Sequence, residues 1–422
     1  MRRRQVAAVL VCFVLCALDG FDILAVTFAA PGIAADWSVG PDAIGTIIAA
    51  GLVGMVIGSL TLSQMADRIG RRRQILLCLS IMSAGMIASA FAPDATVLVG
   101  LRALTGVGLG AMLAAINAMA AEFANDRRRD LAVSVMAAGY PVGGVIGGWG
   151  AAMLLRDHGW EAIFIAGGIG TAIMVPVVLL LLPESISWIV ARGGADALDR
   201  ANAVLRRLGH PEAGRLVRQE QARPAMRNLF KGDLRVITLA MIAVYGLHMM
   251  TFYYALGWTP ALVATLGFDP SSASIVSVFM NLGGAIGGVL LGLSAPTLGL
   301  KRLTLVGLFG AGVAVTIFGV IPADFNALKG GAFAFGFLAN AAVVGLYALI
   351  ARTYPTNLRA TGTGAVIGFG RIGAALGPFI AGLLLAVGAD RGMTSLTMSF
   401  GSVVAAAILL FFVRSKGEGR AS

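Results

Sequence analysis

Charged and metal-binding side chains are scarce in this sequence. Of its 422 residues only 13% are Asp, Glu, Lys or Arg, whereas a soluble globular domain carries about 25%. Cysteine and histidine occur three times each, and Cys12, Cys16 and Cys78 lie in apolar stretches without a CxxC spacing, which argues against a disulfide framework. No Ser/His/Asp arrangement, phosphate loop or metal cluster is visible. We therefore predict no catalytic residues, no metal site and no cofactor.

Apolar sequence takes the place of the missing charge. Hydrophobic residues make up 58% of the chain, and the mean hydropathy is +0.87. They gather in runs of about 20 residues, the length that an α-helix needs to cross a bilayer core of about 30 Å. We predict an all-α membrane protein with twelve transmembrane helices in two six-helix bundles. The predicted spans are 5–30, 43–64, 74–92, 96–122, 131–154, 161–182, 234–265, 272–295, 302–321, 327–352, 358–387 and 392–413.

One long hydrophilic segment, at 184–233, interrupts the apolar runs. It separates six predicted spans from six more, so we predict an N-terminal bundle over 1–183 and a C-terminal bundle over 234–422. The segment is rich in Arg, Asp, Ala and Gly, a composition that favours amphipathic cytoplasmic helices linking the two bundles.

The net charge of +11 follows the predicted topology. Most of the 32 Lys and Arg residues fall in loops on one side of the spans, whereas only Arg156, Lys329 and Arg391 fall on the other. By the positive-inside rule this bias places both termini in the cytoplasm. We therefore expect a multi-pass protein of a cell inner membrane, whose basic charge orients it in the lipid bilayer and does not bind nucleic acid.

Two sequence echoes relate the predicted halves. Residues 63–73, which close the second span, resemble residues 292–302, which close the eighth span. Residues 122–129, after the fourth span, are echoed by residues 352–359, after the tenth. The two echoes have nearly the same offset along the chain, which argues against a chance match. Parallel repeats of this kind place a substrate site at the interface between the halves, near the bilayer midplane.

The first echo carries charges that suit a gate. A carboxylate at a helix end, beside arginines and a glycine turn, can form charge-assisted hydrogen bonds that hold neighbouring helices closed on the cytoplasmic side. The alternative is that the arginines only enforce topology. The residues to which we assign this gating role, and which we call the latch, are Asp67, Arg68, Gly70, Arg71, Glu122, Arg129, Glu184 and Arg359.

Two carboxylates interrupt the first predicted span. Asp19 and Asp22 are three residues apart, so they lie on one face of the helix, about 20–25 Å from its start. Acidic groups inside a membrane are costly, and in transporters they commonly carry protons or bind ions. We predict a proton-coupling role for both. The alternatives are an interfacial pair in water and a structural pair neutralised by Arg102.

Two arginines are also predicted inside spans. Arg102 lies about 10 Å into the fourth span, close to the depth of the aspartates, so we expect an Arg102–Asp ion pair that takes part in proton coupling. Arg371 lies about 20 Å into the eleventh span, and spans seven to twelve as drawn contain no acidic residue. A carboxylate substrate could supply the missing partner of Arg371 through a bidentate pair. Backbone carbonyls, snorkelling and an Asp from the other half are the alternatives.

The seventh span offers polar aromatic side chains to a ligand. Tyr245, His248 and Phe252 share one helical face, where rings could stack on an aromatic substrate and polar groups could bond a ring hydroxyl. We predict substrate contacts for Tyr245 and His248, and also for Asn340, an isolated polar residue in the tenth span. Helix packing, an interface belt and interhelical hydrogen bonds are the alternative roles.

Several of these motifs resemble those of a known family. Residues 67–72 (Asp-Arg-Ile-Gly-Arg-Arg) look like the loop signature of the major facilitator superfamily, residues 102–110 resemble its fourth-helix motif, and residues 182–185 its sixth-helix exit. Two departures stand out: Ser63 replaces the usual opening Gly, and Pro-Thr at 296–297 replaces the Asp-Arg expected in the second copy. The resemblance therefore implies a latch that operates mainly in the N-terminal half.

The first span narrows the resemblance. Asp19-Gly20-Phe21-Asp22 resembles the first-helix signature of the aromatic acid:proton symporter family, whose members import benzoate-type acids such as 4-hydroxybenzoate and protocatechuate. The resemblance implies proton-coupled uptake with both aspartates in the coupling role. We therefore expect a symporter, functional as a monomer, whose partners are protons and a small aromatic carboxylate and which works by alternating access.

Other functions are weighed against this one. The same fold could carry another organic anion, such as a sugar acid or an aliphatic monocarboxylate, or could work as an exporter. A membrane sensor should carry an appended soluble domain, and an enzyme should carry a catalytic constellation. Neither is visible in the sequence.

Overall fold

The helices of this chain match the apolar runs of its sequence. The structure, a computed structural model, describes residues 1–125, 128–216, 226–355 and 358–412. Every regular element in this described part is a helix, and twelve of the helices are long and apolar enough to cross a membrane, which confirms the predicted all-α membrane fold. The spanning helices are α1 (Arg3–Trp37), α2 (Pro41–Leu60), α4 (Arg71–Ala90), α5 (Ala95–Phe123), α6 (Arg129–Asp157), α7 (Glu161–Leu181), α10 (Gly232–Ala264), α11 (Pro270–Leu298), α12 (Leu300–Val320), α13 (Phe325–Thr353), α14 (Arg359–Ala386) and α15 (Arg391–Phe412).

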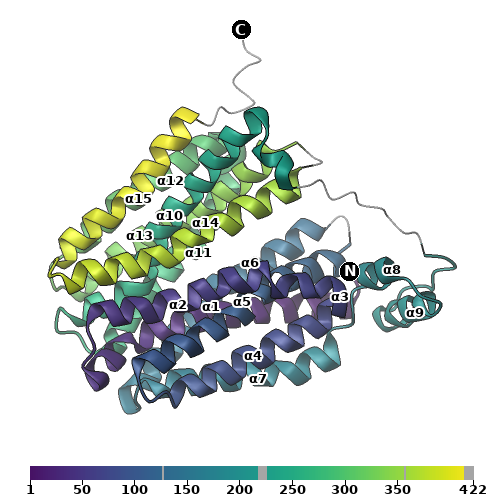
Figure 1. Cartoon of the computed structure of the whole chain (residues 1–422), viewed down its shortest axis with the longest axis horizontal. Helices are drawn as coiled ribbons and strands as arrows, with labels where there is room; N and C mark the ends of the chain where they lie inside the picture. Colours follow the sequence, from purple (N-terminus) through teal and green to yellow (C-terminus); the bar gives the residue numbers. More distant parts are fainter. Residues whose placement is uncertain (126–127, 217–225, 356–357, 413–422) are drawn as a thin grey trace, which may run out of the picture. The chain divides into compact units, whose positions relative to one another are not determined.

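Shorter helices occupy the connections. A 3-10 turn at Leu62–Gln64 and α3 (Met65–Ile69) follow α2, and a second 3-10 turn, Met226–Phe230, precedes α10. The hydrophilic segment contains α8 (Ile186–Arg192) and α9 (Ala197–Leu208), which pack side by side (Figure 1). These two helices bury a small apolar cluster of their own and expose charged residues, as amphipathic helices do.

Aspartates begin four of the spanning helices, among them α15, where Asp390 accepts from the Met393 N–H. The side chain of Asp94 accepts a hydrogen bond from the Val97 N–H at the start of α5, and Asp324 does the same at the start of α13, the equivalent helix of the second half. Asp269 caps α11 through the Ser272 N–H. Each cap satisfies a main-chain donor that has no partner within the first helical turn.

The chain forms two compact units. Unit 1 contains Met1–Ala25, Val53–Gly144 and the described part of Glu161–Ala222. Unit 2 contains Val26–Leu52, Val145–Trp160 and the described part of Arg223–Ser422. The boundaries cut α1, α2 and α6, so each of these helices contributes one part to each unit. Each unit is described separately below.

The same helix crossing occurs in both units. In unit 1, Gly54 and Gly58 of α2 face main-chain carbonyls of α5, and in unit 2 Gly283 and Gly287 of α11 face main-chain carbonyls of α13. A Cβ atom at any of the four would lie between 2.0 and 2.2 Å from a carbonyl oxygen, so only glycine fits. Because the second pair follows the first at the same offset as residues 292–302 follow residues 63–73, the internal repeat extends from the sequence to the packing.

A second repeated crossing sets the register of the first helix of each half. A Cβ on Gly143 of α6 would lie 1.8 Å from the Ala17 carbonyl oxygen of α1. In unit 2 a Cβ on Gly373 of α14 would lie 1.9 Å from the Gly246 carbonyl oxygen of α10. Ala17 in α1 therefore corresponds to Gly246 in α10, and the neighbouring positions of the two helices correspond in the same register.

Candidate functional site

The first helix carries a buried acidic pair in unit 1. Asp19 and Asp22 of α1 are 3% and 1% exposed, and both lie in an otherwise apolar stretch of helix. Between them, Gly20 packs against the main chain of Tyr140 in α6, where a Cβ would lie 2.2 Å from the carbonyl oxygen. The main chains of α1 and α6 therefore meet closely between the two carboxylates.

Arg102 of α5 lies against this acidic pair. Its Nη1 is 3.3 Å from Asp22 Oδ1, and both side chains are buried. The guanidinium stacks 5.0 Å from the centre of the Phe164 ring, and Nη2 is 3.3 Å from Met86 Sδ. Asp22 Oδ2 and Arg102 Nε have no hydrogen-bond partner among the described residues. The ion pair is therefore long and incompletely satisfied for a pair that is shielded from water.

Unit 2 presents a cation beside two tyrosine hydroxyls. The hydroxyls of Tyr245 in α10 and Tyr347 in α13 are 3.2 Å apart, and a Cβ on Gly370 of α14 would lie 2.3 Å from the Tyr245 ring. The next residue, Arg371, is partly exposed and close enough to act electrostatically on the Tyr245 hydroxyl. It forms no hydrogen bond or ion pair with any residue that the structure describes. Arg371 thus keeps its donors available.

The other two predicted substrate contacts have partners within the protein. His248 Nδ1 is 2.9 Å from Ser402 Oγ of α15, and Nε2 is 3.0 Å from the Ala339 carbonyl oxygen of α13. Asn340 Nδ2 donates to the Gly284 carbonyl of α11 at 2.7 Å. In this conformation both side chains join helices, the alternative role open to them, and a substrate contact by either stays a prediction.

The predicted latch centres on a glycine turn. Gly70 has φ +102° and ψ +151°, a conformation that essentially only glycine adopts. A Cβ there would also lie 2.4 Å from Glu184 Oε2. Glu184 Oε1 accepts hydrogen bonds from the main-chain N–H of Arg72 at 3.0 Å and of Ser185 at 2.9 Å. The glycine turn thus brings the start of α4 against the segment that follows α7.

A second carboxylate extends the contact. Arg71 Nη1 lies 2.6 Å from Glu122 Oε2 of α5, and the Ser185 hydroxyl donates to the same oxygen at 2.6 Å. The main-chain N–H of Ser187 donates to Glu122 Oε1 at 2.7 Å. We call Arg71, Glu122 and Ser185 the Arg71–Glu122 network. It joins α4, α5 and the start of α8 through charge-assisted hydrogen bonds.

The remaining predicted latch residues lie around this network. The Asp67 carbonyl accepts from Trp188 Nε1 at 2.9 Å, and the Arg68 carbonyl accepts from Arg192. Arg129 is exposed, and its Nε donates to the Ala121 carbonyl at 3.3 Å. Arg359, in unit 2, is exposed and has no ion-pair partner among the described residues. The structure thus brings Gly70, Arg71, Glu122 and Glu184 together in unit 1, and their gating role stays a prediction.

Two residues of these sites were missed by the sequence analysis. Ser185 lies in the segment with Glu184, and besides contacting Glu122 its hydroxyl caps α8 through the Trp188 N–H. Tyr347 lies seven residues after Asn340 on α13, the spacing of one helical face. That spacing was the available signal for Tyr347, and a Ser before a short helical pattern was the signal for Ser185.

Metal ligands are not grouped in the described part of the chain. No set of three His, Cys, Asp or Glu side chains that could hold a metal ion occurs there. Cys12, Cys16 and Cys78 are all buried and unpaired.

The sequence matches one protein-family model and is similar to several characterised transporters. The family model described as Major Facilitator Superfamily matches residues 10–292 and 241–422. The gallate transporter of Pseudomonas putida is 33% identical, over 89% of this chain and 85% of its own. The 4-hydroxybenzoate transporter PcaK of Pseudomonas aeruginosa is 30% identical, over 97% of this chain and 93% of its own. The 3-(3-hydroxy-phenyl)propionate transporter of Escherichia coli is 30% identical, over 96% and 93%.

A solved structure shares the fold. The inward-open conformation of the xylose transporter XylE from Escherichia coli superimposes with a TM-score of 0.77, and the match covers 98% of each chain. The sequence identity is 17%, so the likeness extends to the fold alone.

Proposed function

Because this chain belongs to the major facilitator superfamily, we propose that it is a proton-coupled symporter that imports a small aromatic carboxylate across a cell inner membrane. Its family and its curated relatives are transporters, so the chain is a multi-pass membrane transporter and not an enzyme. The names of the relatives, which refer to gallate, 4-hydroxybenzoate and 3-(3-hydroxyphenyl)propionate, support an aromatic acid as cargo. The distribution of Lys and Arg supports cytoplasmic termini.

The observation that carries the proposal is the buried Asp22–Arg102 pair beside Asp19. Arg102 Nη1 lies 3.3 Å from Asp22 Oδ1 and 3.5 Å from the Asp22 carbonyl oxygen, and a second carboxylate lies one helical turn away. Protonation of Asp22 would remove one charge of the pair and release Arg102 to other partners. Because a proton would thereby change which contacts α1 and α5 make, it can favour one conformation over the other, as coupling requires.

The substrate end of the proposal rests on Arg371. Its guanidinium can donate a bidentate pair to a carboxylate. The Tyr245–Tyr347 pair beside it offers hydroxyls to a ring hydroxyl, with Tyr347 the more exposed of the two. His248 and Asn340 brace the helices around this site and, when those helices move, become available to the ligand. An aromatic acid with ring hydroxyls fits this combination better than an aliphatic acid does.

The latch completes the proposed cycle. Proton and substrate binding on the outer side would favour closure there, and the Gly70 turn and the Arg71–Glu122 network would open on the cytoplasmic side. Asp67, Arg68, Arg129 and Arg359 would contribute their charges to the closed state of that side. Coupling requires each ligand to bind the two states with different affinity, and the gradients of proton and substrate set the direction of the cycle.

Uptake into proteoliposomes tests the proposal. Radiolabelled gallate, 4-hydroxybenzoate, benzoate, an aliphatic monocarboxylate and a sugar acid are compared with and without an inward proton gradient. A gradient of one pH unit is worth about 1.36 kcal/mol per coupled proton, so we expect about tenfold accumulation of an aromatic acid, abolished by a protonophore. Uptake of the aliphatic or sugar acid alone would overturn the cargo. Aromatic acid uptake that ignores the gradient would overturn the coupling.

A further inference from the structure

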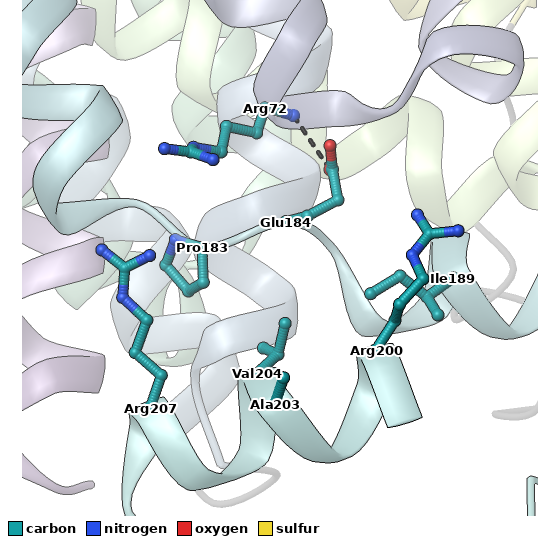
Figure 2. A pocket seen from close by; sticks show the side chains of 8 residues that line it. All are labelled: Arg72, Pro183, Glu184, Ile189, Arg200, Ala203, Val204 and Arg207. Atoms are coloured by element: carbon teal, nitrogen blue, oxygen red, sulfur yellow. Dashed lines mark hydrogen bonds between the residues drawn. The ribbon is translucent and has the colours of Figure 1, made fainter. Parts of the chain in front are cut away.

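A cavity of about 280 Å³ lies in unit 1 beside α9 (Figure 2). Three guanidinium groups and one carboxylate share its wall with apolar side chains. The lining residues are Arg72, Pro183, Glu184, Ile189, Arg200, Ala203, Val204 and Arg207. The transport function proposed above gives this cavity no ligand.

One face of α9 supplies half of the lining. Arg200, Val204 and Arg207 follow each other at helical spacing, so their side chains leave α9 in one direction, toward Glu184 and Pro183 (Figure 2). Arg200 also lies over the Trp188 ring, with 5.5 Å between the guanidinium and the ring centre. Two cations thus stand on either side of an apolar floor.

The one carboxylate in the wall does not neutralise these cations. Glu184 is already bound to two main-chain N–H groups, and none of the ion pairs among the described residues links it to Arg200 or Arg207. Arg4 adds a further positive charge, because it donates to the Arg207 carbonyl. The cavity therefore keeps an excess of positive charge that favours an anion.

Apolar surface adjoins the same arginines. Arg207 donates to the Leu180 carbonyl, and Arg72 donates to the Leu179 carbonyl, both in the last turn of the spanning helix α7. The side chains of Leu180 and Leu181 are 70% and 50% exposed. Cations that line the cavity are thus in direct contact with the exposed apolar end of a transmembrane helix.

We propose that this cavity binds the phosphate headgroup of an anionic phospholipid, whose acyl chains lie along the exposed leucines of α7. Guanidinium groups bind phosphate oxygens through paired N–H donors, and basic pockets beside membrane spans suit anionic headgroups. A soluble phosphate compound shares the headgroup chemistry but would leave the leucines uncovered. The position beside Glu184 would let the bound lipid stabilise the segment that meets the Gly70 turn.

Native mass spectrometry of the full-length protein in detergent tests this assignment. Phosphatidylglycerol and phosphatidylcholine of the same acyl length are titrated against the wild type, Arg207→Gln and Arg200→Gln. Arg206→Gln is the matched control, since Arg206 is exposed, pairs with Glu212 and does not line the cavity. Because a surface cation contributes about fivefold to the affinity for anionic lipid, each lining variant should bind phosphatidylglycerol about fivefold more weakly. Arg206→Gln should match the wild type.

Several outcomes decide between this and other occupants. Equal binding of the two lipids, or an equal loss in Arg206→Gln and Arg207→Gln, would overturn a site at this cavity. In a second arm, glycerol 3-phosphate and inorganic phosphate are assayed as competitors. Displacement of the lipid by either at equal concentration would overturn the lipid in favour of a soluble anion. Arg200→Gln carries the test if Arg207→Gln does not fold, because Arg200 makes no hydrogen bond to α7 among the described residues.

Discussion

The turns at Gly70 and Gly299 occupy equivalent places in the internal repeat and both have a positive φ, but different side chains surround them. Gly70 and Gly299 have φ of +102° and +87°, and each immediately precedes a spanning helix. A Cβ on Gly70 would lie 2.4 Å from Glu184, whereas the atom nearest to a Cβ on Gly299 would be Arg302 Cδ at 3.9 Å. The connection between helices requires the glycine in both halves, and only the first half adds a carboxylate.

The helices that follow these turns differ in the same way. Arg71 pairs with Glu122 in unit 1, but Leu300 and Arg352 stand at the corresponding positions of unit 2. Leu300 is buried in an apolar cluster with Leu291, so packing takes the place of the ion pair. Arg352 is exposed. An apolar contact does not respond to charge, so in our proposal gating by ion pairs belongs to the first half.

Inside the predicted spans the two units differ in the same way: unit 1 has an ion pair where unit 2 has uncharged side chains. Asp22 and Arg102 form an ion pair in unit 1, and Thr251 and Ala332 occupy the equivalent positions in unit 2. The Thr251 hydroxyl donates to the Met398 carbonyl at 2.7 Å, a neutral hydrogen bond. The two units share helix crossings but not chemistry. Proton coupling thus belongs to unit 1 in our proposal, and Arg371 gives unit 2 the carboxylate.

We expect the largest effect from removing the buried charge of Arg102, which has no charged equivalent in unit 2. Arg102→Gln leaves Asp22 buried without its cation, a change that costs about 3–5 kcal/mol. We expect proton-driven uptake in proteoliposomes to fall about 100-fold. Thr251→Val is the matched change in unit 2. The loss of its two neutral hydrogen bonds, to the Met398 carbonyl and from the Ser402 N–H, should cost about 2 kcal/mol and leave most of the uptake. Uptake like that of the wild type in Arg102→Gln would remove the distinction between the units.

The glycine turns provide the next test. Gly299→Ala imposes only the strain of a positive φ, about 1–2 kcal/mol. Gly70→Ala adds a clash with Glu184 and disturbs its two hydrogen bonds, for a total of about 3 kcal/mol. Unfolding temperatures in detergent should therefore rank wild type, Gly299→Ala and Gly70→Ala in falling order. Equal temperatures for the two variants would show that Glu184 moves away at no cost.

The Arg71–Glu122 network predicts a third difference. Glu122→Gln keeps the size of the side chain but weakens charge-assisted hydrogen bonds, which contribute about 1.5–3 kcal/mol. We expect a lower unfolding temperature and an altered uptake rate. Arg352→Gln, the equivalent position of unit 2, should change neither. If Glu122→Gln and Arg352→Gln behave alike, the proposal that the latch operates mainly in the N-terminal half is wrong.

Substrate recognition should depend on unit 2. Arg371→Lys replaces a planar fork with a single ammonium, and we expect the apparent KM for every transported acid to rise about tenfold. Tyr347→Phe should raise the KM for a ring-hydroxylated acid by a smaller factor and leave benzoate unchanged, because only the hydroxyl is lost. An unchanged KM in Arg371→Lys would separate Arg371 from the substrate.

The smallest effect concerns a cap at the start of α11 that the start of α2, its equivalent in the first half, lacks. Gly40 stands at the position equivalent to Asp269, whose pKa lies below its usual value of 3.8 because the Ser272 hydroxyl and main-chain N–H donate to its carboxylate. The cap, worth about 1 kcal/mol, is fully present above pH 3.8 and is lost as the pH falls through the lowered pKa. The difference in unfolding temperature between wild type and Asp269→Ala should therefore be constant from about pH 7 to about pH 5. Below pH 3.8 it should shrink, and a constant difference down to about pH 2 would contradict this origin.

The sequence was sufficient for the fold because the signals involved are local. Each spanning helix is a continuous apolar run, and the bilayer permits few structures besides a helix for such a run. The depth of Arg102 in its span, counted at a constant rise per residue, was enough to expect it beside Asp19 and Asp22. Both kinds of inference need only the order of residues along one helix.

The contacts of the candidate sites needed the structure. Ser185 meets Glu122 across 63 residues, and Tyr347 meets Tyr245 across 102. No periodicity specifies which side chains face each other over such separations. His248 is a case in which periodicity suggested a contact that the structure gives to other residues. Its helical face suggested a ligand contact, but Ser402 and the Ala339 carbonyl, both on other helices, take its two nitrogens.

The repeated glycine crossings also have a mechanical consequence. At the α2–α5 and α11–α13 crossings, backbone meets backbone over a full helical turn, so a slip of one residue would drive a side chain into a carbonyl. Each pair therefore behaves as a single stiff rod. Bending is expected outside these crossings, where a proline interrupts the hydrogen-bond ladder, as at Pro141 of α6, Pro378 of α14 and Pro296 of α11. Stiff crossings and bending points thus occupy different segments of the chain, and in α11 both lie on one helix, because Pro296 follows the crossing at Gly287.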